Sequence, residues 1–124
     1  MADGIRKSDG ARGKLVGPAP WGPEGHTVYE WSDTQPRFTR EILPDHMVVN
    51  PDEPKNGRWG QVAELAVATG GAALKLGEIA ALCLDGGWYT ETELDAVRQL
   101  DRLENLVKLM RSRVEAARRT QRNA

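Results

Sequence analysis

The sequence is poor in cysteine and has no excess of charge of either sign. Among its 124 residues Cys83 is the only cysteine, and a single thiol cannot form an internal disulfide, which excludes a disulfide-framed secreted scaffold. The 17 lysines and arginines balance 18 aspartates and glutamates, for a formal net charge of -1. Proteins whose main work is to coat nucleic acid need many cationic side chains to neutralise phosphates, so this near-neutral balance argues against that class.

Long apolar runs are scarce as well. The first eight residues carry charges with no apolar stretch behind them, so they do not form a signal peptide. The longest uncharged stretch of the second half runs from 65 to 74 and is too short to cross a bilayer. The sequence therefore predicts a protein that is neither exported by a signal peptide nor bound to a membrane, and that is located in the cytoplasm or in a virus particle.

Proline is absent from the last seventy residues, because all seven prolines lie before residue 55. We therefore divide the chain into an extended arm (1–25), a β-hairpin with a Pro-rich loop (26–58) and a helical body (59–124). The arm is rich in glycine and has few large apolar side chains, so alone it does not bury enough surface to offset the entropy of ordering it. Trp21 gives it one anchoring surface, and a docking arm and a solvated linker both stay open.

Two short segments of the first half have the composition of strands. Residues 26–31 and 37–42 are rich in β-branched and aromatic side chains, and residues 32–36 between them have turn chemistry. We expect a β-hairpin over about 26–42. Because a two-stranded ribbon alone is marginal in water, it must lie on helices or on a neighbouring subunit, and Trp31 is the second expected anchor for a partner.

The second half has helical periodicity. From residue 59 to 84, apolar or small side chains recur every three or four residues, as on one buried face of a helix. Gly70 and Gly71 fall in the middle, where each glycine costs about 1 kcal/mol relative to alanine, so we expect a kink or a break there. The small side chains from Ala66 to Ala73 would also let another backbone approach closely.

The most regular pattern lies in the last segment. A helix is expected over about 90–119, with apolar residues at alternating spacings of four and three, the heptad pattern of a surface that packs along another long helix. One interface between two antiparallel helices leaves apolar surface uncovered, so a third layer is needed. We therefore expect a mainly α fold, a long helical hairpin with an extended arm and a β-hairpin, in a homo-oligomer or a larger assembly. The partner interface is expected at Ala96, Leu100, Leu103, Val107, Met110 and Val114.

Residues suited to chemistry are few. His26 and His46 are the only histidines, and neither has further metal ligands at a suitable spacing, so no metal or cofactor is expected. Asp45 beside His46 is the one candidate acid–base pair, and a solvated loop histidine is the competing interpretation. Cys83 lies in an apolar run rather than in a setting that stabilises a thiolate, and no phosphate-binding loop surrounds the glycines. The sequence therefore favours a protein that is not an enzyme.

Two functions follow from these patterns. The first is a non-enzymatic structural or assembly protein that binds further copies of itself and other subunits; by analogy of architecture, its setting is an accessory capsid or head-to-tail component of a tailed-phage particle. The second is a small DNA-binding regulator whose basic C-terminal helix end touches a few phosphates, although acidic residues at the start of that helix argue against a helix-turn-helix. The candidate nucleic-acid contacts are Arg111, Arg113, Arg118, Arg119 and Arg122.

Overall fold

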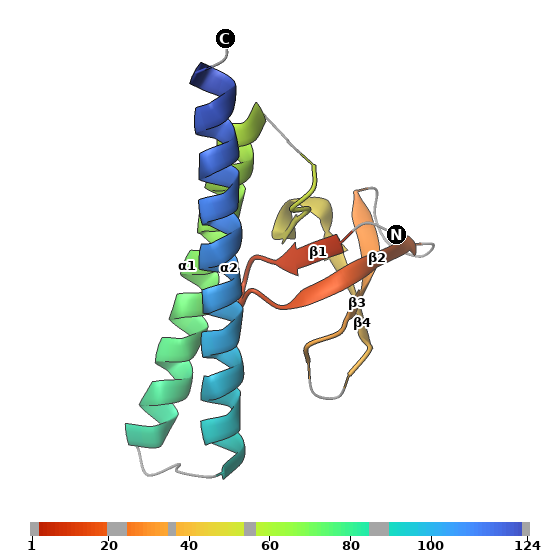
Figure 1. The fold of residues 1–124 in the computed structure, drawn as a ribbon. Coiled ribbons are helices and arrows are strands. Elements are labelled where there is room, and N and C mark those ends of the chain that lie inside the picture. The colour runs from red at the N-terminus through yellow and green to blue at the C-terminus, as the bar shows by residue number, and fades with distance from the viewer. Residues whose placement is uncertain (1–2, 20–24, 35–36, 54–56, 85–89, 123–124) are drawn as a thin grey trace.

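The computed structural model describes residues 3–19, 25–34, 37–53, 57–84 and 90–122. In it, an antiparallel sheet of five strands is followed by two long helices (Figure 1). The strands are β1 (Asp3–Arg6), β2 (Arg12–Pro18), β3 (His26–Trp31), β4 (Thr39–Pro44) and β5 (Val48–Val49), and a 3-10 turn, η1 (Asp45–Met47), precedes β5. The helices are α1 (Gly57–Leu84) and α2 (Thr90–Arg122).

The sheet has the strand order β4-β3-β2-β1-β5, and every neighbouring pair is antiparallel. β1 pairs with β2 on one side and with β5 on the other, where Ile5 lies opposite Val49. A register shift between Leu15 and Gly17 interrupts the pairing of β2 with β3. Because a bulge of this kind bends a strand and increases its twist, the sheet curls.

The expected fold class is wrong. The chain is not a mainly α hairpin with an extended arm and one β-hairpin, because residues 1–25 contribute β1 and β2, and the hairpin of β3 and β4 is one edge of the five-stranded sheet. The glycines of β1 and β2 were the reason that the sequence predicted a flexible arm for this segment. Gly4 and Gly13 pair across β1 and β2, and a side chain at Gly13 would collide with the Glu30 backbone and the Trp31 ring. Glycine there lets the strand pass directly beneath an aromatic ring.

The expected break at the glycine pair is also absent, because α1 is one continuous helix across Gly70 and Gly71. The turn between β1 and β2 packs against α1 at Gly71, where a Cβ atom would overlap the carbonyl oxygen of Lys7. The close backbone approach expected from the small side chains is therefore present. Packing of this kind, rather than intrinsic propensity, supplies most of a helix's stability in a protein.

The core joins the sheet to both helices, which lie along one side of it (Figure 1). A second buried cluster is centred on the Trp31 ring, which stacks on Tyr29 with 5.6 Å between centroids. The guanidinium of Arg6 lies 5.0 Å from the Trp31 centroid on its face, a favourable cation–π contact. The main cluster consists of Ile5, Val49, Leu65, Ala68, Ala72 and Leu106.

Asp9, in the turn between β1 and β2, is the centre of a buried ionic network. Its carboxylate accepts hydrogen bonds from Arg6 at 2.6 and 2.9 Å and from the Ala11 backbone at 3.1 Å, and Arg102 of α2 lies 3.5 Å away. Its carbonyl oxygen accepts a bond of 2.6 Å from Gln99. Burial alone would raise the pKa of Asp9, but the hydrogen bonds and the two arginine charges together hold that pKa below its usual value.

This network makes stability depend on pH. Because the pKa of Asp9 is lower in the folded than in the unfolded chain, its contribution to the free energy of unfolding is complete above about pH 4 and is lost as the pH falls through the folded value. We expect Asp9→Asn to destabilise the protein at neutral pH, with the difference from wild type shrinking in acid. Urea unfolding across pH measures this, with exposed Asp95→Asn as control. A difference that does not change with pH would contradict the role of Asp9.

Candidate functional site

The side of α1 that faces away from the sheet can be located from its contacts. Glu64 pairs with Lys7 at 2.5 Å, and Gly71 packs on the backbone of the same residue, so both mark the sheet side. Ala66 and Ala73 follow them by two residues, which is about 160° round a helix. The two alanines therefore lie on the outer side of the helix pair.

Eight residues of α1 form an exposed heptad stripe on this outer side, at uninterrupted spacings of four and three. None of the eight is charged. A Cβ atom at Gly70 or at Gly77 would meet nothing within 4 Å, so the surface is open at its middle. We call this set the outer stripe: Trp59, Ala63, Ala66, Gly70, Ala73, Gly77, Ala80 and Leu84.

α2 continues the apolar surface beside the outer stripe. Arg102 faces the sheet, where it bonds to Asp33, and Leu100 precedes it by two residues and so points about 160° away. Leu100 and Val107 are 46% and 47% exposed. No part of the chain that the structure describes covers this side of the helix pair.

The interface predicted on the last helix divides between two surfaces. The buried face of α2 includes two polar residues, Gln99 and Arg102. The row of apolar residues predicted as the interface therefore does not coincide with the buried face of α2. Leu103 and Met110 pack against the main core cluster. The other four predicted interface residues are half-buried or exposed: Ala96, Leu100, Val107 and Val114.

Sequence reasoning missed the outer stripe. It assigned one apolar face to each helix and, on α1, followed the face that carries the buried Leu65 and Ile79. The available signal was a second set of alanines and glycines at the same heptad spacing, half a turn away. Small side chains give a weak hydrophobic signal, although they allow the closest approach of another helix.

The two expected tryptophan anchors have different positions. Trp21 lies outside the described residues. Trp31 is fully buried, and its Nε1–H donates to the carboxylate of Glu41 at 3.1 Å. Trp31 therefore packs inside its own chain in this structure.

The arginines expected to contact nucleic acid lie in the second half of α2. Arg111, Arg118 and Arg119 are exposed. Arg113 donates to the carbonyl oxygen of Pro51 at 3.1 and 3.2 Å, so its guanidinium is engaged in holding the loop before α1. Arg122 is the last residue of α2.

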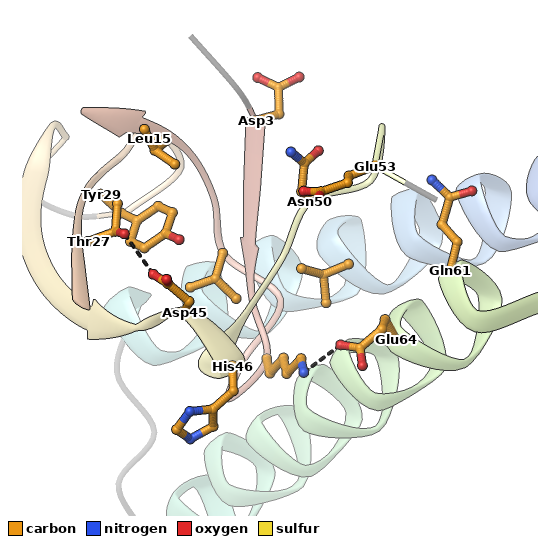
Figure 2. Close-up of a pocket in the computed structure, with 13 residues that line it drawn as sticks. Asp3, Leu15, Thr27, Tyr29, Asp45, His46, Asn50, Glu53, Gln61 and Glu64 are labelled. Atoms are coloured by element: carbon orange, nitrogen blue, oxygen red, sulfur yellow. Dashed lines mark hydrogen bonds and ion pairs between the residues drawn. The ribbon is translucent and has the colours of Figure 1, made fainter. Parts of the chain in front are cut away.

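A pocket of about 350 Å³ lies between the sheet and α1 (Figure 2). Its lining is acidic, with four carboxylates, of which Glu64 is paired with Lys7. Burial and the nearby charge of Asp45 raise the pKa of Tyr29, against a hydrogen bond with Thr27 that lowers it, so the phenol stays neutral at pH 7. The carboxylates that line the pocket are Asp3, Asp45, Glu53 and Glu64.

The candidate acid–base pair lies at the edge of this pocket. Figure 2 shows the Asp45 carboxylate turned toward Thr27, whose hydroxyl donates to it at 2.6 Å, and the His46 ring turned away from both. Among the described residues no three His, Cys, Asp or Glu side chains are grouped so that they could hold a metal ion. Cys83 is a half-buried free thiol on α1. The pocket thus offers an acidic surface to solvent, with His46 and Asp45 facing different ways.

Comparison of the chain with protein-family models, with curated proteins and with solved structures found no match. Within the described ranges, α1 is long and apolar enough to cross a membrane by length and composition, and 17% of its apolar window is buried inside the chain.

Proposed function

We propose that this chain is a non-enzymatic structural subunit that acts as a homo-oligomer, with the outer side of the helix pair as its interface. The exposure of the outer stripe along the whole of α1 supports this proposal. Monomeric proteins rarely expose contiguous apolar patches of more than a few hundred Å². With 28 residues α1 is about 42 Å long, and two packed helices are about 20 Å wide. The resulting face is about 800 Å², apolar on α1 and mixed in polarity on α2, and this is the area that each partner contributes to a standard interface.

A bilayer is a poorer cover for this side than another protein. α2 presents Glu104 and Arg111 next to Leu100 and Val107, and charged side chains in the hydrocarbon region are costly. A partner protein can instead pair those charges at the rim of an apolar interface. The tailed-phage setting and the alternative role as a DNA-binding regulator stay predictions from the sequence.

The mass of the protein in solution tests the proposal. We expect native mass spectrometry and light scattering to show at least twice the mass of one chain. Ala73→Asp, in the middle of the outer stripe, should convert this species to a monomer that keeps its helical circular dichroism, because the new carboxylate would be buried without a partner. Lys75→Asp is the matched control, since it places the same residue two positions along α1, on the other side of the helix.

Three results would count against this function. A wild-type protein that is monomeric at every soluble concentration has no such interface. An oligomer that survives Ala73→Asp uses another surface. Flotation of the wild-type protein with phosphatidylcholine vesicles, abolished by Ala73→Asp, would mean that lipid covers the stripe.

A further inference from the structure

Two copies of the chain can pack the outer sides of their helix pairs together about a two-fold axis in two ways. If the axis lies across the helices, α1 packs antiparallel on α1 of the second copy, and α2 packs antiparallel on α2. If the axis runs along the helices, each α1 packs on α2 of the other copy. The charges on the outer side of α2 distinguish the two arrangements.

Charge on the outer side of α2 changes sign along the helix. Leu100 and Val107 mark this side, and exposed charged residues continue their heptad spacing in both directions. The acidic members precede the middle of the helix and the basic members follow it. In chain order these charged residues are Glu93, Glu104, Arg111 and Arg118.

Only one arrangement gives some of these charges partners. The bond from Gln99 to the Ala72 carbonyl and the contact of Thr69 with Met110 place the centre of the outer stripe level with about residue 103 of α2. When α2 packs antiparallel on α2 of the second copy, Glu93 of each helix therefore lies against Arg111 of the other. When α2 packs on α1, the same four side chains lie against the outer stripe, which has no charge or side-chain polar group except the Trp59 indole N–H. Charges that lose water without gaining a partner are strongly unfavourable, so complementarity favours the antiparallel arrangement.

The outer stripe fits the same arrangement. Its six inner members are alanine or glycine, and its two large residues, Trp59 and Leu84, stand at opposite ends. Antiparallel packing centred between Gly70 and Ala73 brings the small residues of the two copies together, which permits an interaxial distance near the lower limit of about 8 Å. It also places Trp59 of each copy beside Leu84 of the other.

We propose that two copies of this chain associate through antiparallel α1–α1 packing centred between Gly70 and Ala73, with α2 pairing antiparallel beside it. The result is a four-helix layer with one sheet on each outer side. This inference rests on the proposed function and specifies the partner, direction and register of the interface.

Engineered cysteines test the register. We consider a chain that carries Ala63→Cys and Ala80→Cys together in a Cys83→Ala background. In the proposed dimer, position 63 of each copy lies beside position 80 of the other. Seventeen residues separate them, which is about 26 Å along the helix, far beyond the roughly 7 Å that a disulfide can bridge between Cα atoms. We expect mild oxidation to convert most of the double variant to covalent dimer, and neither single variant to cross-link. Ala63→Cys/Glu78→Cys is the matched control, because residue 78 lies about 160° round the helix from residue 80.

The outcomes separate this inference from the proposed function. Cross-linking of either single variant would place identical residues together and overturn the antiparallel arrangement. A protein of dimeric mass whose Ala63→Cys/Ala80→Cys variant does not cross-link would also overturn it, while the proposed function stands. A monomeric wild-type protein would overturn both.

Charge exchange on α2 gives a second, independent test. Glu93→Arg alone and Arg111→Glu alone each set like charges against one another across the two-fold axis, and we expect each to raise the dimer dissociation constant about tenfold or more. A mixture of the two variants restores opposite charges at both contacts, so the heterodimer should dominate in native mass spectrometry. A mixture that yields no more than the statistical half of heterodimer would overturn the pairing of α2 with α2.

Discussion

Alanine at Gly71 is expected to destabilise the protein severely, whereas alanine at the neighbouring Gly70 is expected to stabilise the single chain slightly. A Cβ atom at residue 71 would overlap the Lys7 carbonyl oxygen and lie 3.0 Å from the carbonyl carbon of Ser8. These are backbone atoms of the turn that joins β1 to β2 and cannot rotate away as a side chain would. Overpacking at such a site costs about 3 kcal/mol or more.

Gly70 is the matched control for this substitution. A Cβ atom there meets nothing within 4 Å, and alanine is favoured over glycine inside a helix by about 1 kcal/mol. Urea unfolding of both variants at several protein concentrations gives the two free energies, because association would make the apparent stability depend on concentration. If Gly71→Ala were as stable as wild type, the turn between β1 and β2 would not rest on α1.

Arg102→Met is expected to lower the free energy of unfolding by about 3 kcal/mol. The Arg102 side chain is 10% exposed, and its guanidinium donates to the Asp33 carboxylate at 3.1 Å, to the Asp33 carbonyl at 2.9 Å and to Gln99 Oε1 at 2.8 Å. It also lies 3.5 Å from the carboxylate of Asp9. Without Arg102, the carboxylates of Asp33 and Asp9 and the amide oxygen of Gln99 would stay partly buried and lose a hydrogen-bond donor. Leaving such groups without a partner costs more free energy than replacing both members of a buried ion pair by apolar residues.

Arg98→Met provides the comparison one turn earlier on α2. Arg98 pairs with Asp95 at 2.7 Å, but its side chain is 30% exposed and the pair lies within one helix, so the loss should be below about 1 kcal/mol. A cycle with Asp9→Asn isolates the coupling between Arg102 and Asp9. If the Arg102 and Arg98 variants had equal stability, the network around Asp9 would contribute little to holding α2 on the sheet.

Helical segments could be predicted from spacing, because the buried faces of α1 and α2 repeat along the sequence. Strands β1 and β2 could not, since their glycines were the evidence for a flexible arm. In the structure Gly13 is required by the overlying Trp31 ring, a contact between residues on different strands. Local composition describes what a segment does alone, and these strands are stable only through neighbours supplied from elsewhere in the chain.

The buried polar residues of α2 were equally hard to predict. Gln99 and Arg102 look like solvent-facing positions between apolar heptads, and they are buried because Asp9 brings acceptors to them from the first strands. Nothing within α2 indicates that partner. The outer stripe of α1 was within reach of sequence reasoning, because its alanines and glycines keep heptad spacing, whereas the identity of what covers it depends on a second molecule.

The hydrogen bond from Gln99 to Asp9 has a consequence for biosynthesis. Ninety residues separate the two partners, and the contact of Arg102 with Asp9 spans 93. A ribosome makes the strands first, yet the turn between β1 and β2 gains its last contacts only when α2 has emerged. Long-range contacts of this kind slow folding. The sheet is therefore expected to complete its structure late in translation, and until then the unpaired strands and the apolar sides of α1 are exposed to chaperones and to aggregation.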